Sequence, residues 1–213
     1  MKIPVVYEDD AVIVIDKPAG VLTMATETER ERTAYAFLRA RAKAKRPPQK
    51  IFIVHRLDRE ASGLLVFAKT VEAKDYLQSQ FKNHSAGRIY RAVVEGNVTP
   101  EEFTIRTFLD ENRAFRVYST QKHGAGKLAV THVRVLKRKA RTTLIEIRLE
   151  TGRKHQIRVH LAERGYPIVG DKSYGTGRTK ANRLALHGVR LEFQHPATGK
   201  RMTFESHPPV GWA

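Results

Sequence analysis

The chain has 213 residues, enough for one large domain or two small ones, and its 41% hydrophobic content suffices for a buried core. A formal net charge of +17 favours an acidic polymer as partner, nucleic acid first and an anionic membrane surface second. The absence of cysteine excludes disulfides, thiolate nucleophiles and Cys-ligated zinc. No apolar run approaches the ~20 residues of a membrane span. Acidic residues interrupt the N-terminal segment, so we expect no signal peptide and a cytoplasmic protein.

The first half of the chain predicts short strands and two helices. Strands are expected over residues 3–7 and 11–16, the second ended by the turn at 17–20. A helix is expected from Thr33 to Lys45, ended by the prolines at 47 and 48. The segments IFIV (51–54) and LLVF (64–67) are typical of buried strands, being short, apolar and partly β-branched. Thr70 is expected to cap a helix with apolar residues at 73, 77 and 81.

The second half predicts more strands than helices. Strands are expected over residues 89–95, 115–119, 130–136 and 144–149, followed by a helix over 151–165. Two last strands, over 184–193 and 201–206, are joined by a turn at 195–199. Many strands and few helices without regular alternation predict an α+β fold.

One turn between two predicted strands concentrates charge. In HRLDREASGLL, Asp58 lies between Arg56 and Arg59, at the link between IFIV and LLVF. A carboxylate held beside guanidinium groups stays ionised, as a nucleophile or an electrostatic catalyst must be. From the chemistry alone, a surface hairpin with locally paired charges is an equally good interpretation.

The same run resembles the catalytic signature of the RluA-type RNA pseudouridine synthases, HRLD-(R/K)-x-T-S-G-L-L, with Ala61 where threonine is usual. Three more segments follow the family's order: IDKPAGVLT (15–23), RIYRAVVEG (88–96) and TGRKHQIRVHLAERGYPIVGDKSYG (151–175). The resemblance implies the pseudouridine synthase fold, a bent, mainly antiparallel mixed sheet with flanking helices and a central active-site cleft. It further implies one catalytic domain over residues 1–213, without a preceding S4 RNA-binding domain, and we expect a monomer.

The resemblance also implies the site residues. Asp58 falls on the catalytic aspartate, Arg158 on the arginine that pairs with it, and Tyr90 on the tyrosine that stacks on the target base. Arg56 matches the arginine that fills the space left by the flipped base. The other candidate RNA-binding residues are His55, Lys17, Arg153 and His155. The alternatives are a core tyrosine at Tyr90 and a solvated basic face on the helix predicted over 151–165.

The implied function is isomerisation of uridine to pseudouridine in ribosomal or transfer RNA. This reaction gains and loses no atoms, so we expect no cofactor. We expect no metal either, because His155 and His160 are five residues apart and HExxH is absent. Gly124–Lys127 lacks the first glycine and the Ser/Thr of a phosphate-binding loop. The main alternative is a catalytically silent RNA-binding or ribosome-assembly protein on the same fold. The target uridine, and a covalent or a glycal route, stay open from sequence.

Overall fold

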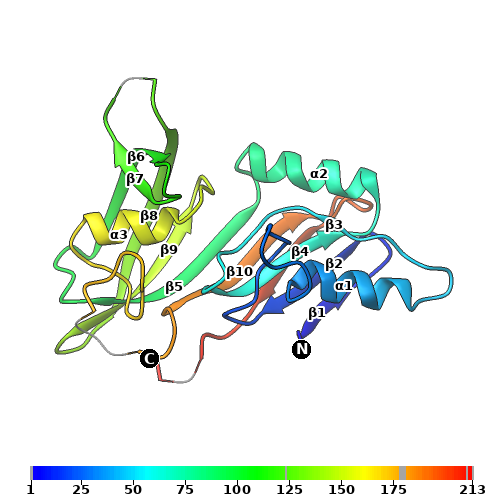
Figure 1. The fold of residues 1–213 in the computed structure, drawn as a ribbon, viewed down its shortest axis with the longest axis horizontal. Coiled ribbons are helices and arrows are strands. Elements are labelled where there is room, and N and C mark those ends of the chain that lie inside the picture. Colours follow the sequence, from blue (N-terminus) through cyan, green and yellow to red (C-terminus); the bar gives the residue numbers. More distant parts are fainter. Residues whose placement is uncertain (1, 123, 178–180, 210, 213) are drawn as a thin grey trace. The chain divides into compact units, whose positions relative to one another are not determined.

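The computed structural model describes residues 2–122, 124–177, 181–209 and 211–212, which form two compact units (Figure 1). The first unit contains the described residues up to Arg88 together with Gly188–His207, and the second contains the remainder. Strands β5 (Gly87–Glu95) and β10 (Leu186–Gln194) contribute residues to both units. The single domain expected over residues 1–213 stays a prediction. Within the described residues, every helix is too short or too polar to cross a membrane.

The first unit combines a sheet with two helices. Besides most of β10, its elements are β1 (Val5–Glu8), β2 (Val12–Lys17), α1 (Ala34–Lys43), β3 (Phe52–Ile53), β4 (Ser62–Ala68), α2 (Val71–Lys82) and β11 (Arg201–Glu205). The strand order is β1-β2-β4-β10-β11, and β3 also pairs with β4. The pairs β1–β2, β2–β4, β3–β4 and β10–β11 are antiparallel. Strand β4 is buried along its whole length, as its apolar sequence predicted.

Helix α2 covers the core of the first unit. Its residues Ala73 and Leu77 pack with apolar side chains of three strands: Val12, Val14, Leu64, Val66, Leu191 and Phe193. The helix begins where the sequence predicted, because the Thr70 hydroxyl accepts a hydrogen bond from the backbone N–H of Ala73 at 3.1 Å. This packing makes β4 and α2 a fixed support for the loop that precedes β4.

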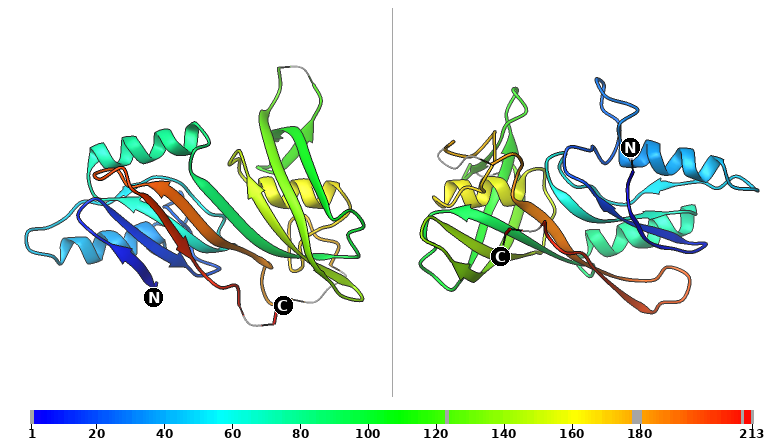
Figure 2. Two further views of the ribbon diagram at one scale, coloured as in Figure 1. Left: turned by 180° about the vertical axis from the view of Figure 1, so that it is seen from behind. Right: turned by 90° about the horizontal axis from the view of Figure 1, so that it is seen from below.

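The second unit is an antiparallel sheet packed against one helix. Its elements besides β5 are β6 (Glu102–Glu111), β7 (Val117–Thr120), β8 (Lys127–Arg138), β9 (Thr142–Leu149) and α3 (Gln156–Glu163). The strand order is β5-β9-β8-β6-β7, and each neighbouring pair is antiparallel. Leu109, Val117, Ala129 and Val159 form a core where the sheet meets α3. Figure 2 shows these strands in green and α3 in yellow from two further sides.

The α+β class is confirmed, while three local predictions are wrong. Strand β6 was not predicted, because its side chains alternate between exposed and half-buried along most of its length and give little apolar signal. Phe115 was placed in a strand but lies in the turn between β6 and β7 with φ of 60°. The helix expected from residue 151 begins only at Gln156, because His155 has a left-handed backbone with φ of 52°.

Candidate active site

Asp58 lies in the loop between β3 and β4 of the first unit, where the sequence predicted it. Its side chain is half-buried, while Arg56 and Arg59 on either side are exposed. The preceding residue, Leu57, is held by the buried Thr23. The Thr23 hydroxyl donates to the Leu57 carbonyl at 3.0 Å and accepts from the Leu57 N–H at 3.1 Å. This two-way contact fixes the backbone immediately before the carboxylate.

Lys17 holds the backbone on the other side of Asp58. The side chain is 0% exposed, and its ammonium donates to four carbonyl oxygens: Val21 and Ala61 at 2.7 Å, Pro18 at 3.0 Å and Arg59 at 3.3 Å. Two of these carbonyls follow Asp58 in the loop, and two belong to the turn after β2. We expected Lys17 to contact RNA, and this expectation is corrected: the buried ammonium binds carbonyl oxygens inside the first unit and so positions the loop.

His55, at the start of the same loop, is also directed into the first unit. Its Nε2 accepts a hydrogen bond from the Val66 N–H at 3.2 Å, and its ring stacks on Phe81 of α2 at 4.3 Å between centroids. Burial, and then the positive charge of Arg88, lower the pKa of His55 to about 3. The imidazole is therefore neutral at physiological pH. We expected an RNA contact here, but these contacts tie the loop to β4 and α2.

Tyr90 lies on β5 in the second unit. Its side chain is 7% exposed and shares one face of the strand with Ala92 and Val94, both fully buried. Strand β9 places Ile147 opposite Tyr90. The alternation predicted from the sequence is therefore present, and it confirms the face on which the tyrosine lies.

Arg158 is a buried cation of α3, with 2% of its surface exposed. Its Nε and Nη2 donate to the two carboxylate oxygens of Asp171, each at 2.8 Å. Asp171 Oδ1 also accepts from the backbone N–H groups of Ser173 and Tyr174 at 2.9 and 3.0 Å. Burial alone would raise the pKa of Asp171, but the hydrogen bonds and charge of Arg158 outweigh it and lower that pKa. The guanidinium is thus fixed by a carboxylate that we did not predict.

Arg153 and His155 precede α3 instead of forming its first turn. The exposed Arg153 donates from Nε to the Leu128 carbonyl at 3.0 Å. His155 Nδ1 lies 3.0 Å from the hydroxyl of Tyr174, whose ring also lies 5.3 Å from the Arg158 guanidinium carbon. The predicted basic helix face is therefore a basic turn, in which Arg153 is exposed while Lys154 and His155 are half-buried.

The predicted residues divide between the two units. Arg56, Asp58, His55 and Lys17 belong to the first, and Tyr90, Arg153, His155 and Arg158 to the second. That Asp58, Tyr90 and Arg158 share one site stays a prediction. Sequence reasoning missed Asp171, although it belongs to GDKSYG at the end of the third motif. An aspartate in a turn commonly accepts hydrogen bonds from the backbone about two residues further on, which is the signal that could have found it. In the described part of the chain, no group of three His, Cys, Asp or Glu residues could hold a metal ion.

Comparisons with known proteins agree with the motifs. Residues 11–163 match the model of the RNA pseudouridylate synthase family. The chain is 39% identical to a ribosomal large subunit pseudouridine synthase D of Neisseria meningitidis over 98% of its own length and 59% of that protein. It is 40% identical to the protein of that name in Pseudomonas aeruginosa, over 98% of its own length and 69% of the Pseudomonas protein. The chain thus spans less than two thirds of the Neisseria relative.

A solved structure supports the same assignment. Human RNA pseudouridylate synthase domain containing 1 superposes with a TM-score of 0.80 at 25% identity, covering 98% of this chain and 84% of the human chain. The fold, the sequence identity and the family match therefore agree. The chain belongs to the RNA pseudouridylate synthase family.

Proposed function

We propose that this protein is an RNA pseudouridine synthase that isomerises uridine in ribosomal or transfer RNA, with Asp58 as its catalytic carboxylate. The observation that carries the proposal is the loop around Asp58. Thr23 holds Leu57 on one side, and the Lys17 ammonium holds the carbonyls of Arg59 and Ala61 on the other. A backbone anchored on both sides of one half-buried carboxylate is what a preorganised catalytic group requires. The names of the Neisseria and Pseudomonas relatives favour ribosomal RNA.

The chemistry needs little beyond such a carboxylate. Pseudouridine formation breaks the N1–C1′ bond of uridine, turns the detached uracil and joins C5 to C1′, and the C5 proton leaves while N1 gains one. Atoms balance without an oxidant or a reductant. Asp58 would supply the anionic oxygen at the reacting sugar and base, and an aromatic wall would hold the detached uracil. We assign that wall to Tyr90.

Arg158 is the residue that we propose to orient Asp58. Asp171 binds the Nε and Nη2 edge of its guanidinium and so fixes the orientation of that group. A planar, permanently charged guanidinium can bind two carboxylates at once. The proposal requires Arg158 from the second unit and Asp58 from the first to act on one uridine.

RNA binding would draw on the exposed basic residues. Arg56 is exposed next to the Asp58 loop, and we propose that it fills the stack when the target nucleotide flips out, a step that costs roughly a few kcal/mol. The exposed Arg153 and the half-buried His155 would contact the RNA from the second unit. Lys17 and His55 we assign to positioning the loop, because the Lys17 ammonium and the Nε2 atom of His55 form hydrogen bonds inside the first unit.

The test is tritium release from RNA labelled at uracil C5, prepared from cells that lack this protein. We expect release by the wild type and none by Asp58→Asn, because the substitution keeps size and removes charge. Glu60→Gln is the matched control: it neutralises an exposed carboxylate two residues away in the same loop and should retain activity. Release by Asp58→Asn would refute the assigned role. No release by the wild type, with RNA still bound, would favour the silent binding protein.

A further inference from the structure

The turn between β6 and β7 is a rigid tip in the second unit. The Asn112 N–H donates to the Arg116 carbonyl at 3.0 Å, and the Phe115 N–H donates to the Asn112 carbonyl at 2.9 Å. The Asn112 side chain accepts from the N–H groups of Ala114 and Arg116, both at 3.0 Å. Four hydrogen bonds across five residues therefore fix the direction in which Phe115 points.

Phe115 is unusual in two independent respects. Its side chain is 75% exposed, the most exposed large hydrophobic side chain among the described residues. Its backbone has φ of 60°, a left-handed conformation that bulky side chains rarely adopt and that glycine or asparagine adopts more readily. Neither core packing nor backbone preference accounts for an aromatic ring here, which suggests that the ring contacts a ligand.

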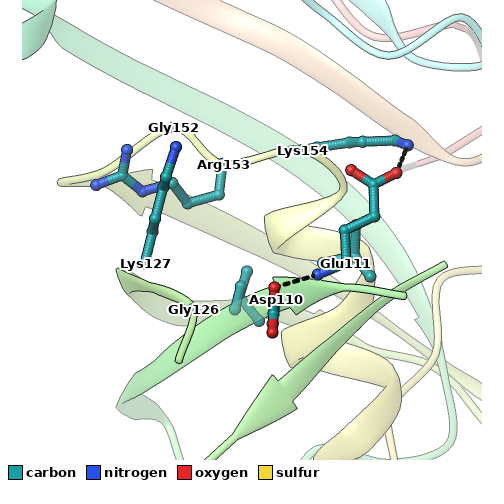
Figure 3. Close-up of a pocket in the computed structure, with 9 residues that line it drawn as sticks. Asp110, Glu111, Gly126, Lys127, Gly152, Arg153 and Lys154 are labelled. Atoms are coloured by element: carbon teal, nitrogen blue, oxygen red, sulfur yellow. Dashed lines mark hydrogen bonds and ion pairs between the residues drawn. The ribbon is translucent and has the colours of Figure 1, made fainter. Parts of the chain in front are cut away.

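Basic residues lie close to this ring in sequence and in space. Arg113 and Arg116 flank it in the turn and are exposed, and the Lys154 ammonium lies 5.6 Å from the ring centroid. A pocket of about 460 Å³ on the same hairpin is lined by Lys127, Arg153 and Lys154, with Asp110 and Glu111 (Figure 3). Lys154 pairs with Glu111. Figure 3 shows the side chains of Lys127 and Arg153 together at the other side of this pocket.

We propose that this tip is a contact site for single-stranded RNA, in which Phe115 stacks on an unpaired base while Arg113, Lys127 and Arg153 bind the backbone phosphates. An exposed aromatic ring among cations is the combination that binds single strands without reading sequence. One ring offers too little apolar area for a protein interface or a membrane anchor, whereas a nucleobase needs only one face. The inference rests on the proposed RNA substrate and adds a second contact surface to it.

The decisive variant is Phe115→Asn. Asparagine tolerates the left-handed backbone, so the variant should melt at the same temperature as the wild type or higher. Its affinity for a fluorescein-labelled oligouridylate of about a dozen nucleotides, measured by anisotropy, should fall about 5- to 150-fold, the equivalent of losing one stacked base. Phe115→Trp should bind as tightly as the wild type. An unchanged affinity for Phe115→Asn would overturn the proposal.

Phe108→Thr is the matched control. Phe108 is 49% exposed on the adjoining strand β6, and its loss removes an aromatic ring from the same hairpin but not from the tip. We expect oligouridylate binding to stay within about twofold of the wild type, since only the tip ring stacks. Equal weakening by Phe108→Thr and Phe115→Asn would refute a stacking role specific to the tip.

A fluorescence experiment tests the contact directly. The chain has one tryptophan, Trp212, so Phe115→Trp in a Trp212→Phe background places the only indole at the tip. Titration with oligouridylate should quench this indole, and unchanged fluorescence at saturation would overturn the contact. Tritium release separates the proposed tip contact from the proposed isomerase activity. If the wild type is active and Phe115→Asn binds oligouridylate as tightly as the wild type, only the tip contact is refuted. If the wild type is inactive but Phe115→Asn still binds oligouridylate more weakly than the wild type, only the isomerase activity is refuted.

Discussion

Replacing Asp171 by asparagine tests whether the buried ion pair fixes Arg158. Both side chains are almost wholly buried, with 2% and 1% of the Arg158 and Asp171 side chains exposed. Asparagine has one acceptor oxygen in place of two. If that oxygen stays with the N–H groups of Ser173 and Tyr174, the new NH₂ group faces the Nε–H of Arg158 across about 2.8 Å. If the amide flips, the NH₂ group faces those same backbone donors instead.

Donor therefore meets donor in either orientation, and Arg158 loses the counter-charge of Asp171. Removing one partner of a buried pair costs about 3–5 kcal/mol, so we expect Asp171→Asn to lower the free energy of unfolding by that amount. Urea denaturation followed by circular dichroism measures the loss. Asp110→Asn is the control, because Asp110 is a half-buried carboxylate of the same unit, and it should change stability by less than about 0.5 kcal/mol.

The pH dependence gives a second readout of the same pair. The pKa of Asp171 is lowered in the folded state, so its contribution is fully present above the unfolded value of about 3.9 and is lost as pH falls through the lower folded pKa. Below that range the wild type should lose its advantage over Asp171→Asn. A stability loss under about 1 kcal/mol at neutral pH, or a difference between the two proteins that persists in strong acid, would refute the reasoning.

Three further outcomes follow from the geometry. Lys17→Met leaves buried carbonyl oxygens without a donor, at about 1–3 kcal/mol each, but it also removes the cost of burying a charge. The free energy of unfolding, measured by urea denaturation, should therefore fall by about 2–4 kcal/mol. An equally stable or more stable variant would contradict the role of Lys17 in holding the loop. Thr23→Val breaks both bonds to Leu57, and it should cost about 1–3 kcal/mol and reduce tritium release beyond that expected from the unfolded fraction. Burial lowers the pKa of His160 to about 4. The unfolded imidazole takes up a proton near pH 6.5 and the folded one does not, so the wild type should lose stability as the pH falls from about 6.5 to about 4. His160→Asn should lose less over the same range. Parallel curves of unfolding free energy against pH for the two proteins would contradict this prediction.

Local sequence signals were sufficient for the elements that surround Asp58. Strand β4 was predicted because its apolar run has no polar interruption, and α2 because Thr70 precedes an apolar repeat of the right period. These properties involve neighbours within a few residues, so no knowledge of the fold is needed to read them. The position of Asp58 in a loop between two strands followed from the same signals, and the role proposed for it came from the family resemblance.

Contacts between distant segments decided the rest. Lys17 bonds to Ala61 across 44 positions, and Thr23 bonds to Leu57 across 34, so neither role can be read from either segment alone. The local sequence predicts Phe115 in a strand, but hydrogen bonds from the backbone to the Asn112 side chain hold it in a turn. The amino-acid sequence alone was sufficient for the fold class, the family resemblance and the list of candidate site residues. The burial of charged groups such as Lys17 and the pairing of Arg158 with Asp171 could be read only from the folded chain, because burial and ion pairing depend on what folding places around each side chain.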